Sequence, residues 1–244
     1  PTAAAQAPHP RPGGDVTPTR AEGHGPAGPG PLGGPWHFAT LPNKNPTAFN
    51  VVDQDGGHVL RVSTQDAYGN MVHTLHLTAS PDLQLQWRWR VDQLIDKADI
   101  KTRDGDDAAL KLCVSFDFDK SQLSLGERAR LRLGRISTGE NIPAETLCYV
   151  WDNKQAVGST QHNAFTHRMR YIVLQSGEQH LGQWVAEQRN LAADYARAFG
   201  DGTRVALGER EFVLQLGGLG LGSGKRGDET FPLGGVTEQL QVAA

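Results

Sequence analysis

The sequence has no excess of charge of one sign and no long hydrophobic run. Its 24 Lys and Arg residues against 27 Asp and Glu residues give a formal net charge of −3. No bulk positive field is therefore available to hold a nucleic-acid backbone or an anionic membrane surface. No apolar run approaches the roughly 18 residues that a spanning helix needs. We expect no nucleic-acid partner and no membrane span.

Several sequence motifs of catalysis and metal binding are also missing. The chain has no Gly-Xaa-Ser-Xaa-Gly elbow and no His-Glu-Xaa-Xaa-His, and its glycine-rich tract lacks the Lys-Ser or Lys-Thr of a phosphate loop. His73 and His76 are three apart in an expected strand, so they face opposite sides and make a poor metal pair. We expect no metal site and no cofactor.

Cysteine is scarce, and only Cys113 and Cys148 are present. Both fall inside expected strands, where the geometry of a bridge is demanding, and we expect two unpaired thiols. The alternative is a bridge formed in an oxidising compartment, which would contribute about 4 kcal/mol by closing a long loop.

Proline and glycine crowd the first part of the chain. Residues 1–35 contain nine Pro and eight Gly, with few large apolar side chains. Such a segment buries too little apolar area to offset the entropy lost on ordering. We expect residues 1–34 to be a disordered leader or linker. They show neither the basic start nor the apolar core of a signal peptide, so an export signal has been removed or never existed.

From Trp36 onward the chain consists mostly of short strands with turn signals between them. The clearest is 83–91, where Leu and Trp side chains alternate with Gln and Arg. By parity, Trp87 and Trp89 belong to the core. Residues 112–118 alternate in the same way, and the Asp-Gly-Gly sequence at 55–57 predicts a hairpin. Further strands are expected at 71–77, 147–151 and 169–174.

Two stretches favour helix. Residues 123–136 are either a basic helix or an exposed strand, with helix preferred. Residues 183–199 place apolar side chains near one helical face, and Gly200 provides a stop. Few helices among many short strands predict a mainly β fold, an antiparallel jelly-roll-like β-sandwich over residues 35–207.

Several motifs together resemble a known family. They are Trp36, the Trp-Arg-Trp-Arg strand at 87–90, the Asp pair at 106–107, Tyr-Val-Trp at 149–151, and Arg-Asn followed by Asp-Tyr at 189–195. Their order and spacing over residues 36–206 are similar to the bacterial domain-of-unknown-function family 3047. The resemblance implies an exported bacterial protein with a jelly-roll-like fold and no assigned activity.

The resemblance stops after Gly202. Residues 208–244 are rich in glycine and lack the acidic loop that the family resemblance leads us to expect there. We treat 208–244 as an atypical C-terminal segment, in which a strand at 211–216 is expected and 217–227 should be irregular. A frame change near Val205 and a divergent native ending remain open explanations, and the first would leave a sheet edge exposed.

The candidate ligand-binding residues are Arg88, Arg90, Asp106 and Asp107. The two guanidinium groups share the polar face of one strand, where they suit a carboxylate, a sulfate or a sugar acid. They also suit ion pairs with Asp106 and Asp107, and we expect at least one such pair. Calcium at these carboxylates is a lesser alternative, because the spacing does not complete an EF-hand loop.

Aromatic and acidic residues leave other functions open. Trp36 and Trp151 are candidate stacking residues for a sugar. A glycosidase needs two carboxylates facing one cleft, and the sequence gives no reason to choose a pair among Asp117, Asp119, Glu140 and Glu145.

Three functions remain at this point. The first is a periplasmic or extracellular β-sandwich that binds a glycan or another cell-envelope component. The second is a polysaccharide-acting hydrolase or lyase on the same fold, and the third is a structural or assembly protein. Fold alone does not choose among them, and the residues leave the catalytic groups and the oligomeric state open.

Overall fold

The computed structural model describes two main blocks of the chain, 67–79 with 81–116 and 145–200, together with shorter segments around them. The expected leader, residues 1–34, lies outside the described residues except for 27–29. The described residues are 27–29, 36–40, 44–54, 57–64, 67–79, 81–116, 125–126, 128–129, 132, 145–200, 208–219, 227–232 and 240–243.

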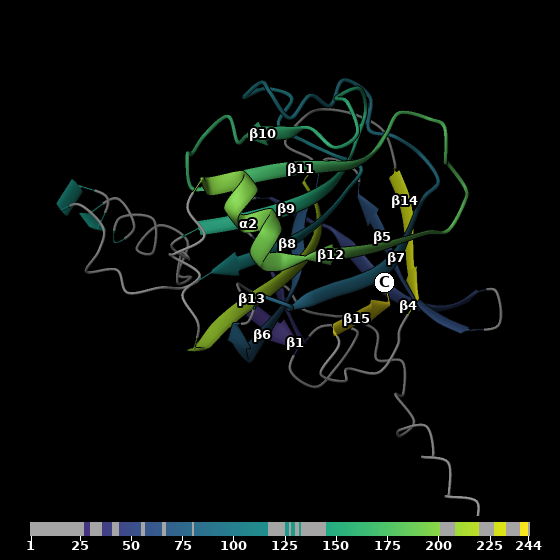
Figure 1. Cartoon of the computed structure of the whole chain (residues 1–244). Helices are drawn as coiled ribbons and strands as arrows, with labels where there is room; N and C mark the ends of the chain where they lie inside the picture. The colour runs from purple at the N-terminus through teal and green to yellow at the C-terminus, as the bar shows by residue number, and fades with distance from the viewer. Residues whose placement is uncertain are drawn as a thin grey trace, which may run out of the picture.

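Strands dominate the described structure (Figure 1). In chain order the elements are β1 (Ala27–Pro29), β2 (Trp36–Ala39), β3 (Asn45–Pro46), β4 (Ala48–Gln54), β5 (Gly57–Thr64), β6 (Ala67–Ala79), β7 (Gln84–Val91), β8 (Leu110–Phe116), β9 (Glu145–Asp152), β10 (Thr160–His162), β11 (Met169–Ser176), β12 (Val185–Asn190), α2 (Leu191–Phe199), β13 (Gly208–Leu219), β14 (Gly227–Pro232) and β15 (Leu240–Ala243).

The strands form two sheets. The larger sheet has the order β1-β2-β6-β13-β8-β9-β11-β10, and β3 joins β6. The smaller sheet has the order β12-β7-β14-β5-β4, and β15 joins β7. Most neighbours are antiparallel, while β9–β11, β3–β6 and β7–β15 are parallel. The predicted fold class, a mainly β, antiparallel jelly-roll-like sandwich, is confirmed.

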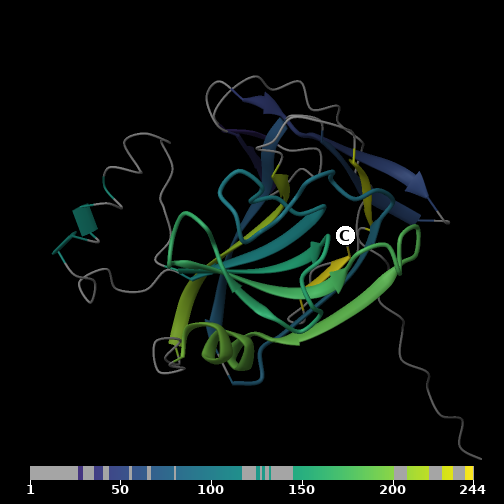
Figure 2. The same ribbon diagram turned by 90° about the horizontal axis from the view of Figure 1, so that it is seen from above.

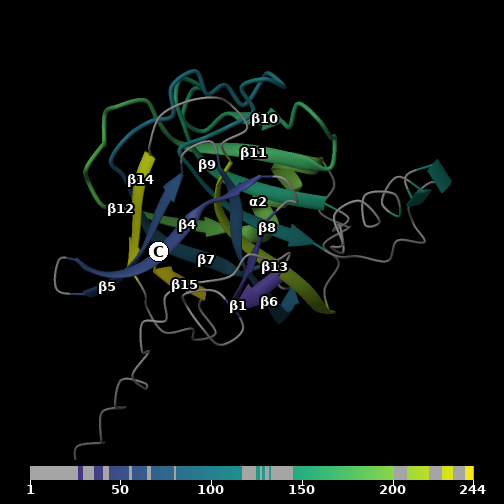
Figure 3. The same cartoon turned by 180° about the vertical axis from the view of Figure 1, so that it is seen from behind.

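The hairpin predicted at the Asp-Gly-Gly turn is present. β4 and β5 pair antiparallel, and the last pair joins Gln54 to Gly57. Figure 3 shows this hairpin on the side of the molecule away from α2. In the stretch expected to favour helix at 123–136, the described residues 125–126, 128–129 and 132 are helical, and the others lie outside the described part.

Large aromatic side chains fill the space between the sheets. Trp87 and Trp89 of β7 are buried, as the period-two pattern predicted, and they meet residues of β9. Trp87 lies 5.1 Å from Tyr149 and Trp89 lies 6.0 Å from Trp151, measured between ring centroids. Aromatic pairs at these distances contribute about 0.5–1.5 kcal/mol beyond their buried area. Trp151 is therefore a core residue, and the alternative of sugar stacking is wrong for it.

Strands β8 and β9 are buried on both faces. Val114 and Phe116 point into the sandwich, as predicted, and the opposite face carries a second apolar cluster. Segment 92–109 contributes Ile100 and Ala108 to that cluster, so it covers the outer face of the larger sheet. The alternation in the sequence did not predict that segment 92–109 covers this face, because small and polar residues occupy the second face of β8.

Cys113 and Cys148 form a disulfide, so the expectation of two unpaired thiols is wrong. They stand directly opposite each other on antiparallel β8 and β9, with their Cα atoms 3.9 Å apart. Directly opposite side chains point to the same face of a sheet and come close together. Register, which the sequence did not determine, brings the two sulfur atoms within bonding distance.

The predicted helix at 183–199 is half wrong. Residues 185–190 form β12, which pairs antiparallel with β7, and the helix α2 begins at Leu191. Asn190 is the N-cap, and its side chain accepts a hydrogen bond from the Ala193 amide at 2.8 Å. Pairing with β12 satisfies the backbone hydrogen-bonding groups along the edge of β7. This gain outweighs the helical pattern of residues 185–190. Gly200 ends the helix at φ 86°, as expected.

Helix α2 packs against the sandwich at its margin (Figure 2). Leu191 and Tyr195 join the main core, and the Tyr195 ring lies 4.9 Å from that of Phe116. The expectation of a helix packed against a sheet therefore holds for residues 191–199. None of the helical residues described here forms a helix long and apolar enough to cross a bilayer.

The glycine-rich C-terminal segment contributes strands to both sheets. β13 pairs with β6 on one side and with β8 on the other, while β14 and β15 pair with strands of the smaller sheet. Gly217, Gly218 and Leu219 continue β13, so the expectation of irregular backbone is wrong for these three residues. Residues 220–226 lie outside the described part. β8 has partners on both sides, so the edge expected for a truncated sandwich is not exposed there.

Reduction of the disulfide should lower the free energy of unfolding by about 4 kcal/mol, because the bridge joins residues 35 apart in sequence. Urea denaturation with and without a reductant measures the difference. The Cys113→Ser, Cys148→Ser double variant is the control, since its midpoint should not respond to the reductant. Equal midpoints for the oxidised and reduced protein would contradict the prediction.

Candidate functional site

The four predicted site residues lie in two separate places. Arg88 and Arg90 are on the outer face of β7, in the smaller sheet, whereas Asp106 and Asp107 lie in the loop before β8, in the larger sheet. All four belong to the described stretch 81–116, and no ion pair joins either arginine to either aspartate. The predicted pairing is therefore wrong, because the two carboxylates are buried against a different sheet.

Arg90 has a neighbour in sequence as its partner. Its Nε donates to Asp92 Oδ1 at 2.6 Å, and both side chains are partly exposed. Such a pair contributes little to stability, but it neutralises the charge of Arg90. Arg88 is exposed, and its guanidinium lies over the ring of Trp184, 5.3 Å from the centroid.

The face around Arg88 is polar, with one aromatic ring. Register places Ala186 opposite Arg88 and Gln188 opposite Gln86 on adjacent strands. Opposite residues share a face, so these four side chains stand together on the outside of β7 and β12. Ala186 is small and exposed, which leaves the space beside Arg88 open. We call Gln86, Arg88, Trp184, Ala186 and Gln188 the outer face.

The sequence reasoning missed Trp184 and Gln188 as site residues. It placed both in a helix, where a residue at 184 has no reason to meet one at 88. The Asn190 cap was the available signal, because an N-cap places the start of the helix directly after itself. With the helix starting at 191, residues 183–190 become available as a strand.

Asp106 lies in a buried hydrogen-bonded cluster. It accepts from the Asn163 amide at 2.6 Å and from the Tyr171 hydroxyl at 2.9 Å. Asn163 also donates to the Tyr171 oxygen at 2.7 Å. All three side chains are buried, so the cluster ties the loop before β8 to the loop before β11. This is a structural role, and Asp106 is not exposed to a ligand.

Asp107 is buried beside the same cluster. It accepts from the Ala108 amide at 2.8 Å. Burial raises the pKa of its carboxyl from 3.8 to about 7, against the opposing influence of Lys111 and of that amide, while Asp106 adds to the rise. Lys111 is itself buried, with its Nζ 5.4 Å from the centroid of the Tyr171 ring and without a hydrogen-bond partner among the described residues.

A second polar cluster lies on the inner side of β12. Asp194 of α2 accepts two hydrogen bonds from Arg189, at 2.7 and 2.5 Å, and a third from the Tyr149 hydroxyl at 2.9 Å. The bidentate pair fixes the helix to the strand that precedes it. Burial and Asp194 raise the pKa of Tyr149 well above its usual value.

Glu187 lies near this cluster on the same side of β12. Burial raises the pKa of its carboxyl, and a 2.8 Å hydrogen bond from Gln175 opposes the rise. Gln175 in turn bonds the His180 ring at 2.8 Å. The sequence offered no reason to select Glu187, since its partners come from β11 and the turn that follows.

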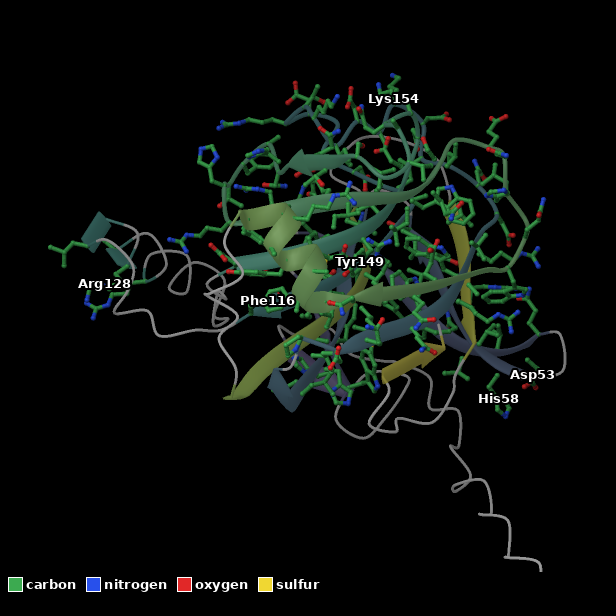
Figure 4. All side chains as sticks on the ribbon, in the orientation of Figure 1. Asp53, His58, Phe116, Arg128, Tyr149 and Lys154 are labelled. Atoms are coloured by element: carbon green, nitrogen blue, oxygen red, sulfur yellow. A yellow bond between two sulfur atoms is a disulfide. The ribbon has the colours of Figure 1, made fainter. Side chains whose placement is uncertain are left out.

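The surface loops carry further charged groups. Figure 4 shows Lys154 in a loop at one end of the molecule, Asp53 and His58 near the β4–β5 turn, and Tyr149 in the interior. Lys154 pairs with Asp99 at 3.0 Å. Within the described ranges, no three His, Cys, Asp or Glu side chains are placed to share a metal ion.

Comparison with known proteins gives one family match. The family described as "Protein of unknown function (DUF3047)" matches residues 34–208. No curated protein matches the chain. Among solved structures, the chain is similar to endoglucanase 3 of Trichoderma harzianum, from family GH12, at 8% identity and a TM-score of 0.41, over 84% of this chain and 90% of that chain.

Asp107 should make stability fall as the pH rises from about 4 to about 7. Its pKa is higher in the folded than in the unfolded chain, so the folded state holds the extra proton in that range and loses its advantage above it. Asp107→Asn cannot ionise. The drop in unfolding free energy between pH 5 and pH 8 should shrink by up to about 3 kcal/mol in this variant, since about two pH units of the shift fall in that interval.

Urea denaturation at both pH values measures the drop. Asp104→Asn, on the same loop but exposed, is the control and should keep the wild-type drop. An unchanged drop in Asp107→Asn would show that Asp107 ionises in the folded protein with an ordinary pKa.

Proposed function

The chain belongs to the DUF3047 family of proteins of unknown function, and we propose that it is an exported β-sandwich that binds a glycan of the cell envelope through its outer face. The observation that carries the proposal is the exposed Arg88 guanidinium over the ring of Trp184, on a face that also carries the amide side chains of Gln86 and Gln188.

The chemistry of the outer face suits a sugar ring. The flat side of a pyranose presents C–H groups that pack on an aromatic ring, and its hydroxyls need hydrogen-bond partners. Trp184 supplies the ring, and Gln86 and Gln188 supply amides that both donate and accept. The small side chain of Ala186 leaves room for a sugar between the two glutamines and the ring.

Arg88 adds a preference for acidic sugars. Arg90 is neutralised by Asp92, whereas the contact found for Arg88 is a ring and not a carboxylate. A guanidinium binds a carboxylate through two parallel hydrogen bonds. We therefore expect an acidic glycan, such as one that contains uronic acid, to bind more tightly than a neutral one.

Export to the periplasm or the cell exterior is supported by the disulfide between Cys113 and Cys148. Structural disulfides form and persist in oxidising compartments and are rare in the cytosol of most organisms. This bridge lies between two buried strands, so it belongs to the folded domain itself.

Hydrolysis of a polysaccharide is the second candidate function. Glu187 favours it, because a half-buried carboxyl with a raised pKa is suited to act as a general acid. Glu187 faces inward on β12, on the opposite side from the outer face. The assay is the release of reducing ends from a polyuronate. Release by the wild type that is lost in Glu187→Gln, while binding persists, would support this function. No release by the wild type would exclude it for that substrate.

The binding proposal predicts the behaviour of three variants on immobilised polyuronate and on an uncharged polysaccharide. Trp184→Ala should weaken binding to both by about tenfold or more, equivalent to about 1.4 kcal/mol. Arg88→Gln should weaken binding to the polyuronate alone. Phe165→Ala is the matched control, because Phe165 is an exposed ring under another guanidinium, that of Arg103, in a loop away from the outer face.

Circular dichroism should show all three variants folded. Equal affinity of Trp184→Ala and the wild type for each polymer would overturn the proposal, as would a loss of the same size in Phe165→Ala.

A further inference from the structure

Positive groups gather at the edge of the larger sheet where β10 ends the strand order. His162 of β10 is opposite Arg170 of β11, and His167 lies in the loop between the two strands. The rings of His162 and His167 are 6.3 Å apart. From α2, Arg197 donates to the carbonyl of Gly158, at the opposite end of β10 from His162. Three segments thus direct cationic side chains to one edge.

Arg170 is held in place without a carboxylate partner. Its Nη1 donates to the carbonyls of His167 and Met169, and its guanidinium lies 5.2 Å from the centroid of the Phe199 ring. Its Nε is buried and has no hydrogen-bond partner in the described structure. Carbonyls and a ring orient the guanidinium, but they do not neutralise it.

The acid that acts on Arg170 is Glu145 of β9. Glu145 is buried and accepts a hydrogen bond from the Tyr195 hydroxyl. No salt bridge joins it to Arg170 in the described structure, and the positive field of Arg170 acts on the His162 imidazole. The His162 pKa reports that field: Arg170 lowers it most, and burial and His167 lower it further.

We propose that this edge binds a tetrahedral oxyanion, a phosphate or sulfate group of a larger ligand, through Arg170, His162 and His167. The exposed imidazoles and the guanidinium of Arg170, which no described carboxylate neutralises, supply N–H donors from different directions, which suits the several oxygens of such a group. An anion would relieve the repulsion among these cations. The site is separate from the outer face, so neither proposal depends on the other.

Binding should strengthen as the pH falls. An anion favours the protonated form of an imidazole, so protons are taken up on binding, and affinity rises as the pH falls through the range in which His162 titrates, below the ordinary histidine value of 6.5. Charged groups on the elements around the two imidazoles are Arg168 and Arg170 from β11 and the loop before it, Arg197 from α2, and Glu145 from β9. Of these, only Glu145 is acidic, and Arg170 is the one whose charge lowers the pKa of His162.

Inorganic sulfate is the first probe, because it does not itself titrate between pH 5.5 and 8. In the full chain, the histidine ring signals are followed by NMR during a sulfate titration at both pH values, at constant ionic strength set with chloride. We expect saturable shifts of His162 and His167, tighter binding at pH 5.5, and an increase in the His162 pKa when sulfate is bound. Shifts that do not saturate, or that chloride reproduces, would overturn the proposal.

Arg170→Gln should weaken sulfate binding about tenfold or more and should raise the His162 pKa in the absence of sulfate. Arg61→Gln is the matched control, because Arg61 of β5, in the smaller sheet, is also half-buried with an Nε that has no hydrogen-bond partner in the described structure. Unchanged sulfate affinity in Arg170→Gln would also overturn the proposal.

Two further variants keep the test informative if Arg170→Gln does not fold. Arg170→Lys retains the charge but loses the fork of donors, and it should bind sulfate more weakly than the wild type. The His162→Asn, His167→Asn double variant should bind with the same affinity at pH 5.5 and pH 8. Persistence of the wild-type pH dependence in that double variant would contradict the role of the imidazoles.

A sugar phosphate and a sugar sulfate distinguish the two sources of the group. Preference for one over the other at pH 5.5, lost in Arg170→Gln, identifies the ligand class. Binding of neither ester would contradict the proposal, even if free sulfate binds, because the site would then accept an adventitious ion only.

Discussion

The contact between the tryptophans of β7 and the aromatic residues of β9 holds the two sheets together. Trp87 and Trp89 leave the smaller sheet on its inner face, and Tyr149 and Trp151 meet them from the larger sheet. Because successive side chains of a strand alternate between faces, burying the tryptophans places Arg88 and Arg90 on the outside. The outer face is thus a geometric consequence of the core.

The edges of the two sheets carry the polar chemistry of the molecule. β12 covers the edge of β7 and in doing so places Trp184 beside Arg88. β10 ends the larger sheet and places His162 opposite Arg170. Trp184 and Arg88 are far apart in the chain, whereas His162 and Arg170 belong to consecutive strands. Both positions lie where the apolar interior gives way to solvent, so charged groups stand there without the cost of full burial.

The buried polar groups show the opposite arrangement. Asp106 and Asp194 are each surrounded by donors, the first by Asn163 and Tyr171, the second by Arg189 and Tyr149. A buried carboxylate needs such partners, because an unpaired one would cost several kcal/mol. These two aspartates secure loops and the helix to the sheets. Arg88 and Arg170 have no carboxylate partner in the described structure, and their charges remain available to bind ligands.

Sequence periodicity determined the parts of the fold that depend on one strand at a time. The alternation at 83–91 predicted the buried face of β7, and the Asp-Gly-Gly turn predicted the β4–β5 hairpin, because local backbone geometry controls both. The sequence also selected Arg88, which lies on the proposed binding surface, although it supplied the wrong partners for it. Family motifs over most of the domain indicated the correct family.

Tertiary structure decided what depends on register and on competing partners. The disulfide exists because Cys113 and Cys148 are opposite each other, and one residue of slippage would turn one of them to the other face. Residues 185–190 became a strand because an open sheet edge competed with helix propensity, and propensity is the weaker of the two. Trp184, Glu187 and the β10 edge acquired their neighbours in the same way, through pairings between segments that no local pattern encodes.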